Sequence, residues 1–228
     1  MQAHDRLVVA IDRSAREDVL RLADDLRGAA GVLKIGLQAF IGNGPGIVRE
    51  LVGRGEKVFL DLKIHDIPNT AGHAIAEASS LGATMATVHA AGGEPMLRAC
   101  AHESLLVLGV TVLTSLGEAD LLQIGFGGSP LANAVRLARL AQSSGLRGVV
   151  ASPLEIESIR EACGTDFVIL TPGIRPAGSD AGDQQRTMTP AGAIRAGADY
   201  IVVGRPITEA PDPRAAALRI VDEMARVS

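Results

Sequence analysis

The chain is poor in aromatic residues and carries no excess of positive charge. Its 228 residues include no Trp, one Tyr and four Phe, too few for a platform on which nucleic-acid bases could stack. The formal net charge of −4 gives no general attraction to nucleic acid or to an anionic membrane surface, so any anion must be bound locally. We therefore expect neither a nucleic-acid partner nor a membrane partner.

Cysteine and long apolar runs are also scarce. Cys100 and Cys163 stand alone, without CxxC spacing, which indicates thiols in a reducing compartment rather than a disulfide framework. The apolar run at 105–113 is about half as long as a membrane-spanning helix. The N-terminal stretch MQAHDRLVVAID lacks the pattern of a signal peptide. Together these features predict a cytoplasmic protein.

Short apolar runs alternate with amphipathic stretches along the whole chain, without a linker. Most runs are almost continuously apolar, as parallel strands are when helices cover both faces of a sheet. Hydrophobic residues make up 47% of the chain, enough for one large core. The expected strands cover residues 6–12, 31–36, 57–62, 83–89, 105–113, 147–152, 166–171 and 199–204.

Eight strand-then-helix units predict an α/β fold, a single-domain (β/α)₈ or TIM barrel over residues 1–228. Ser14 and Glu17 have capping-box spacing at the start of the first helix. The alternative is an open doubly wound sheet, but no GxGxxG opens a helix after the first strand. The expected helices cover residues 14–28, 44–54, 71–81, 93–101, 129–143, 153–162, 189–196 and 213–226.

Ionisable side chains occur where the strands of such a barrel end. Asp12 follows the first apolar run, Lys34 lies inside the second, and Asp61 and Lys63 end the third. Residues two apart on an extended strand share a face, so Asp61 and Lys63 are expected to enter the barrel mouth together. Each alone has an ordinary explanation, a turn Asp or a Lys reaching solvent. Four on one rim favour a site in which opposite charges keep one another ionised.

A second group of residues predicts an anion site. The connection 171-TPGIRPAGSDAGDQQRTMTP-190 is long for a compact domain, and residues 172–187 are predicted to form a phosphate-gripping lid with Arg175 and Gln184. Gly204 and Arg205 follow the eighth strand, where a backbone can approach an anion and a guanidinium can bind phosphate oxygens in a forked manner. Barrels often hold phosphate after strands seven and eight. The alternative is a surface loop with ordinary arginines.

The pattern 61-DLKIHDIPNT-70, read as DxKxxDIPxT, resembles the orotidine 5′-phosphate decarboxylase family. The motifs VVAID, LKIG, VHAAGG, GVTVLTS, TPGIRPAGSDAGDQQR and VVGRPI follow in the same order and extend the resemblance over nearly the whole chain. The resemblance implies a TIM-barrel carboxy-lyase that uses no cofactor and no metal. It would convert orotidine 5′-phosphate to UMP and CO₂, the last step of de novo pyrimidine nucleotide synthesis.

The resemblance also implies roles for individual residues. Lys63 would donate a proton, Asp61 would lie beside the substrate carboxylate and Lys34 would join their charge network. Asp12 would bind the ribose and Thr114 would meet the pyrimidine. The residues implied for the 5′-phosphate are Arg175, Gln184, Gly204 and Arg205.

A homodimer is implied as well. Asp66 and Thr70 would reach across the interface into the partner's site, and Ile67 between them belongs to the implied substrate-binding residues. One departure from the family pattern is the short stretch between Arg98 and Leu105, which affects the expected fourth helix.

Loss of CO₂ from C6 of a pyrimidine leaves a carbanion with little resonance support, and no motif for an electron-accepting cofactor is present. We therefore expect electrostatic catalysis, in which Lys63 stabilises and protonates the carbanion while Asp61 and Asp66 repel the substrate carboxylate. Three alternatives stay open. One is a Mg²⁺-dependent sugar-phosphate decarboxylase or hexulose-phosphate synthase with the same DxKxxD. The others are a Schiff-base aldolase that uses Lys34 or Lys63, and a non-catalytic nucleotide-phosphate binder.

Overall fold

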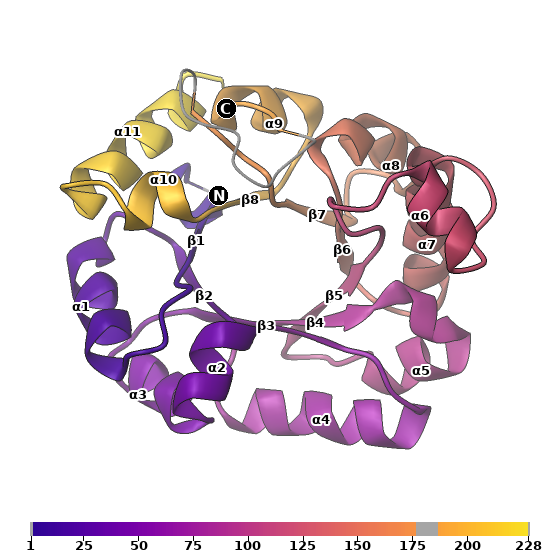
Figure 1. Cartoon of the computed structure of the whole chain (residues 1–228), viewed down its shortest axis with the longest axis horizontal. Helices are drawn as coiled ribbons and strands as arrows, with labels where there is room; N and C mark the ends of the chain where they lie inside the picture. Colours follow the sequence, from indigo (N-terminus) through magenta and orange to yellow (C-terminus); the bar gives the residue numbers. More distant parts are fainter. Residues whose placement is uncertain (1, 177–186, 228) are drawn as a thin grey trace.

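Eight parallel strands close into a barrel in which each strand pairs with the next and β8 pairs with β1. The computed structural model, shown in Figure 1, describes residues 2–176 and 187–227. The closed barrel confirms the (β/α)₈ prediction and excludes an open doubly wound sheet. The strands are β1 (Leu7–Ala10), β2 (Val32–Gly36), β3 (Val58–Ile64), β4 (Met85–His89), β5 (Leu106–Val110), β6 (Gly148–Val150), β7 (Val168–Thr171) and β8 (Tyr200–Val203).

Helices surround the barrel (Figure 1), and none of those described is long and apolar enough to cross a membrane. Each expected helix is present, including the short fourth one, α5. The helices are α1 (Arg16–Leu26), α2 (Leu37–Asn43), α3 (Gly46–Gly53), α4 (Pro68–Ser80), α5 (Gly93–Cys100), α6 (Glu118–Gln123), α7 (Pro130–Ser143), α8 (Ile156–Cys163), α9 (Pro190–Ala196), α10 (Arg205–Thr208) and α11 (Pro213–Ala225). The described residues also form the short 3₁₀ turns η1 (His4–Arg6), η2 (Ala90–Gly92) and η3 (Pro153–Glu155). Sequence reasoning missed α2, α6 and α10, which follow β2, β5 and β8.

The expected capping box of the first helix is wrong. Helix α1 has Ala15 as its N-cap and no side-chain cap, because Ser14 lies one residue too early to reach the free amides. Ser14 instead connects the β1–α1 loop to α2. Its Oγ accepts a hydrogen bond from Gln38 Nε2 at 3.1 Å, and its carbonyl accepts one from Asn43 Nδ2 at 3.0 Å.

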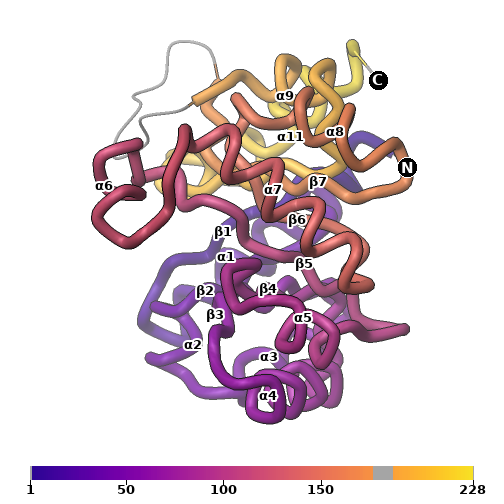
Figure 2. The backbone as a smooth tube through the Cα atoms, turned by 90° about the vertical axis from the view of Figure 1, so that its right-hand side faces the viewer, coloured from indigo at the N-terminus to yellow at the C-terminus, as the bar shows by residue number. Residues whose placement is uncertain are grey.

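The barrel interior is apolar at its base and polar at its mouth. Successive strand residues point to opposite faces, and one set of alternate positions fills the interior with Val8, Val32, Phe59, Met85, Leu108, Leu170 and Val202. The next inward positions on β2, β3 and β4 are polar: Lys34, Asp61 and Thr87. In the side view of Figure 2, α2 and α6 lie at one end of the barrel and the chain begins at the other. The polar layer therefore lies at the carboxyl ends of the strands, where barrels place their sites.

The predicted lid falls only partly within the described residues. Residues 177–186, Gln184 among them, lie outside. The two flanking segments are joined, since Ile174 and Met188 form an isolated β-bridge and the Arg175 amide donates to the Met188 carbonyl at 3.0 Å. Helix α9 begins after Thr189, which is its N-cap. The Thr189 side chain accepts a hydrogen bond from the Gly192 amide at 3.1 Å.

Candidate active site

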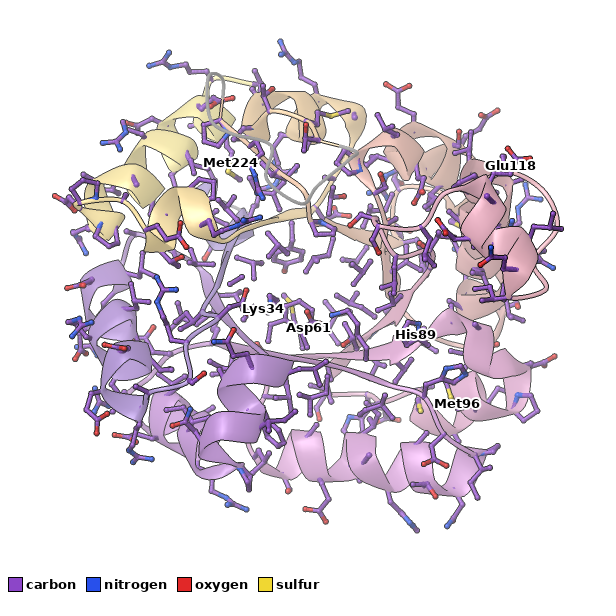
Figure 3. The ribbon with its side chains drawn as sticks, in the orientation of Figure 1. Lys34, Asp61, His89, Met96, Glu118 and Met224 are labelled. Atoms are coloured by element: carbon purple, nitrogen blue, oxygen red, sulfur yellow. The ribbon has the colours of Figure 1, made fainter. Side chains whose placement is uncertain are left out.

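Four ionisable side chains form a line of alternating charge at the barrel mouth. The ammonium nitrogen of Lys63 lies 3.0 Å from each carboxylate oxygen of Asp61. The ammonium of Lys34 lies 3.5 Å from Asp61 Oδ2 and 3.5 Å from Asp12 Oδ1. Figure 3 shows Lys34 and Asp61 inside the ring of strands. The expected convergence of these four residues is confirmed.

The backbone reason for that convergence differs from the one expected. Lys63 is not extended: its φ is 53°, and it is the one non-glycine residue with positive φ in the described part of the chain. The β3–β4 register shifts here, pairing Leu60 with Ala86 and then Ile64 with Val88. The Asp61 and Lys63 side chains therefore meet through a bulge rather than through the regular alternation of a strand.

Asp61 is buried and ionised. Burial alone would raise the pKa of its carboxyl group, but the charges of Lys34 and Lys63, together with hydrogen bonds from Lys63 and Thr87, outweigh burial and hold the pKa below its usual value. The site thus maintains a fixed negative charge between two ammonium groups.

Two histidine rings lie beside this cluster. The ring centroids of His65 and His89 are 5.4 Å apart, and Figure 3 shows His89 farther toward Met96 than Asp61 is. Burial lowers the pKa of His89, with His65 and Lys63 adding to the effect and Asp61 opposing it. The imidazole is therefore uncharged near neutral pH, which limits the positive charge beside Lys63.

Gly36 makes room for the ammonium of Lys34, a role that sequence reasoning missed. A Cβ at this position would lie 2.8 Å from Lys34 Nζ and 3.3 Å from Asp12 Oδ1. A side chain here would displace the lysine from the line of charges. Gly36 ends the LKIG motif, but the sequence does not show why a glycine is needed there. The reason is visible only in the structure, where Gly36 lies against Lys34 and Asp12.

A pocket of about 190 Å³ opens beside the charges. Asp61 and Lys63 line it together with Thr114, and its remaining walls are largely apolar. The apolar walls come from Phe59, Val110, Val112, Leu113, Val150, Ala151, Leu170, Pro172 and Val202. Such a space suits a flat ring with one edge against Lys63 and the other near a hydroxyl.

A second pocket, of about 550 Å³, is cationic. Its lining includes four cationic side chains and two carboxylates, hence a formal excess of two positive charges: Arg13, Lys34, Arg175 and Arg205 against Asp12 and Glu209. Gly173 and Gly204 also contribute, and an added Cβ at Gly204 would make only an ordinary 3.6 Å contact with Ala10. The structure thus brings Arg175, Gly204 and Arg205 together as expected.

Sequence reasoning missed Arg13 as a lining residue of the cationic pocket. The Arg13 guanidinium donates to the Thr208 carbonyl of α10 at 3.1 Å. This hydrogen bond holds the Arg13 side chain at the cationic pocket, which Thr208 also lines. The two pockets share Lys34, Pro172 and Val202 and therefore form one continuous site. Within the described residues no group of three or more His, Cys, Asp or Glu side chains is arranged to hold a metal ion.

Asp66, Ile67 and Thr70 lie apart from both pockets of their own chain. All three are exposed, and none is among the residues that line either pocket. Asp66 Oδ1 accepts a hydrogen bond from the Ile67 amide at 2.6 Å, just before α4 begins at Pro68. The structure of the single chain therefore does not bring these three residues to the line of charges.

Comparisons with known proteins agree with this geometry. A family model described as "Orotidine 5′-phosphate decarboxylase / HUMPS family" matches residues 5–220. Orotidine 5′-phosphate decarboxylase of Heliobacterium modesticaldum is 50% identical, covering 99% of this chain and 98% of the relative. That of Moorella thermoacetica is 49% identical, covering 100% and 95%. The crystal structure of orotidine 5′-phosphate decarboxylase from Lactobacillus acidophilus superimposes with a TM-score of 0.85 at 36% identity, covering 96% and 98%. The chain therefore belongs to the orotidine 5′-phosphate decarboxylase / HUMPS family.

Proposed function

We propose that this protein decarboxylates orotidine 5′-phosphate to UMP and CO₂, the last step of de novo pyrimidine nucleotide synthesis. The observation that carries the proposal is the contact of Lys63 with Asp61 at the edge of an apolar pocket that continues into a cationic one. Relatives at about half identity over nearly their whole length bear the name of this activity.

The substrate fits the two pockets in one orientation. Its phosphate occupies the cationic pocket, near Arg175, Arg205 and the Gly204 backbone, with Gln184 as a further ligand proposed from the sequence. The ribose lies where the pockets join, beside Asp12 and Lys34. The pyrimidine enters the apolar pocket, with Thr114 near its polar edge and C6 toward Lys63.

In the reaction the bond between C6 and the carboxyl carbon breaks, CO₂ leaves and the electron pair stays on C6. The Lys63 ammonium stabilises this charge as it develops and then transfers a proton to C6, which gives UMP and a neutral amine. Solvent reprotonates the amine before the next cycle. Asp61 keeps Lys63 in place through contacts at 3.0 Å, and its negative charge repels the substrate carboxylate.

We further propose a homodimer in which Asp66, Ile67 and Thr70 complete the site of the partner subunit. In the single chain Ile67 is 65% exposed, and Ile41 of α2 is 78% exposed. In the proposed dimer the partner subunit covers these two apolar side chains. A cytoplasmic location is part of the same proposal, because charged nucleotides do not cross a bilayer unaided.

The decisive experiment is an assay in chelator-treated buffer that follows the absorbance of orotidine 5′-phosphate and identifies UMP by chromatography. Turnover at an unchanged rate with and without chelator supports the proposal. Activity only on a sugar phosphate and only with Mg²⁺ would favour the hexulose-phosphate branch. Borohydride trapping of substrate on Lys34 or Lys63 would favour an aldolase. Tight binding of UMP without turnover of orotidine 5′-phosphate would favour a binding protein.

A further inference from the structure

Thr87 of β4 lies opposite the bulge that carries the charged residues. Between the pairs Leu60–Ala86 and Ile64–Val88, β3 has three residues, 61–63, and β4 has one, Thr87. The regular ladder therefore cannot satisfy every backbone group of 61–63 on the β4 side. A buried amide left without an acceptor destabilises the fold.

The Thr87 side chain replaces the missing ladder bond. Its Oγ1 accepts a hydrogen bond from the Lys63 amide at 2.9 Å and donates one to Asp61 Oδ1 at 2.9 Å. An amide can only donate and an ionised carboxylate can only accept, so the direction of both bonds is fixed. Thr87 is 0% exposed, which shields both bonds from water.

These two bonds hold both parts of the proposed acid–base pair. The bond to Asp61 fixes the plane of its carboxylate, and the bond to the Lys63 amide supports a backbone with φ of 53°. That φ is unfavourable for a residue with a side chain. With the Lys63 backbone so held, its ammonium reaches both oxygens of Asp61 at 3.0 Å. Thr87 itself is among the lining residues of neither pocket.

We propose that Thr87 is a positioning residue for the decarboxylation: it touches no substrate atom, and its hydroxyl sets the relative placement of Lys63 and Asp61. The inference rests on the proposed function for its kinetic consequences, although the placement itself is independent of which substrate binds. Catalytic groups must be held within about 0.5 Å of the productive geometry, so we expect the loss of this hydroxyl to lower the rate.

The hydroxyl also acts on the ionisation of Asp61. That carboxylate faces Lys34 from β2, Lys63 from its own strand and Thr87 from β4, with Asp12 beyond Lys34 and His89 farther along β4. The two ammonium groups favour the charged form, and the Thr87 bond adds to their effect. Removing the hydroxyl therefore raises the pKa of Asp61.

The test compares three variants. Thr87→Val keeps the shape of the side chain and removes the hydroxyl, while Thr87→Ser keeps the hydroxyl. Thr84→Val is the matched control, since Thr84 lies directly before β4 and its Oγ1 donates to the Val58 carbonyl at the start of β3 at 3.0 Å. For each variant we would measure kcat and KM for orotidine 5′-phosphate, the Kd of UMP and the acidic limb of the kcat/KM profile.

Thr87→Val is expected to lower kcat about 10–100-fold, with KM and the Kd of UMP changed less than about threefold. Its acidic limb moves to higher pH. Thr87→Ser stays within about threefold of wild type in kcat, and Thr84→Val is unchanged. A wild-type kcat in Thr87→Val, or an equal loss in Thr84→Val, would overturn the inference. If Thr87→Val does not fold, Thr87→Ala takes its place against the same two controls.

A second readout needs no substrate. The pKa of the Asp61 carboxyl group can be measured from the ¹³C chemical shift of its carboxyl carbon as a function of pH. This pKa should rise in Thr87→Val and stay at its wild-type value in Thr84→Val. An unchanged pKa of Asp61 in Thr87→Val would overturn the inference that Thr87 positions Asp61 and Lys63, whatever substrate the protein acts on. A wild-type protein that leaves orotidine 5′-phosphate intact while Thr87→Val shows the raised pKa would instead overturn the proposed function alone.

Discussion

The ammonium of Lys63 contacts both carboxylate oxygens of Asp61 although only one residue separates the two in the chain and Lys63 has a left-handed backbone. A cation in this position is held before any substrate arrives. Preorganised charge of this kind stabilises a developing anion without a reorganisation cost during the reaction.

Lys63→Ala is expected to lower kcat by about 10⁴-fold or more, because the variant loses both a preorganised charge and the proton donor. Single-turnover conversion of orotidine 5′-phosphate is the measurement. The Kd of UMP should change less than about tenfold, which shows that the pocket survives. Lys57→Ala is the control, since Lys57 is an exposed lysine that lies just before β3. A Lys63→Ala enzyme within tenfold of wild type would remove Lys63 as the donor.

Arg205→Ala should weaken UMP binding about tenfold or more and lower kcat/KM for the nucleotide, because a charged hydrogen bond to phosphate is lost. Binding of uridine, which has no phosphate, should stay the same. Calorimetric titration with both ligands separates the two effects. Arg98→Ala removes an exposed arginine of α5 as a control. Equal losses for UMP and uridine would place the phosphate elsewhere.

Asp61 should contribute to the pH dependence of stability. Its folded-state pKa is lowered, so the unfolded chain takes up the proton first as the pH falls through about 4. The contribution is complete above about pH 5 and is lost as the pH approaches the lowered folded-state pKa. When the free energy of unfolding is measured by denaturant titration between about pH 3 and pH 6, it should depend less on pH for Asp61→Asn than for wild type. Asp166→Asn controls for the loss of one exposed carboxylate; parallel curves for Asp61→Asn and wild type would contradict the prediction.

Mixing two inactive variants tests the shared site. If Lys63 of one chain acts with Asp66 of the other, a mixed dimer of Lys63→Ala and Asp66→Asn contains one intact site and one doubly altered site. Random reassortment should then restore about a quarter of wild-type activity per chain. Activity is measured after unfolding and refolding the mixture, with each variant refolded alone as the control. No recovery in a mixture that does form mixed dimers would mean that each chain uses its own Asp66.

Arg160 should matter for stability and not for activity. Its guanidinium donates to the carbonyls of Gly164, Thr165, Phe167 and Gly197 and to the Asp199 carboxylate, at 2.7–3.0 Å. These groups lie at the amino ends of β7 and β8, away from the pockets. Arg160→Met should lower the free energy of unfolding by about 2–4 kcal/mol with kcat unchanged at 25 °C. Arg139→Met, on the exposed face of α7, should cost less than about 0.5 kcal/mol.

Much of the barrel could be predicted because its signals are local. Continuous apolar runs give the strands, and each strand of the structure overlaps its expected range. Helices α2, α6 and α10 have only 7, 6 and 4 residues, too few to show a helical period. The missing cap at Ser14 has a related cause, since its partners Gln38 and Asn43 lie on α2, a helix that the sequence pattern did not show.

The sequence predicted those site residues that belong to a recognisable motif or that end a predicted strand. Asp61 and Lys63 stand in one motif, and Asp12 and Lys34 follow from the order of the strands. Thr87 was not found because its role depends on a register shift between β3 and β4, which no local pattern encodes. The same holds for Arg13, which reaches the cationic pocket only because β8 and α10 close against β1.

The cationic pocket takes its walls from both ends of the chain: Asp12 and Arg13 follow the first strand, and Gly204 and Arg205 follow the last. During synthesis on the ribosome, all eight strands must emerge before these walls can meet. A nucleotide in the cell can therefore stabilise the growing chain only after the eighth strand has emerged, because a ligand adds stability only to a state that binds it. Until then the growing chain depends on its own apolar contacts to avoid misfolding.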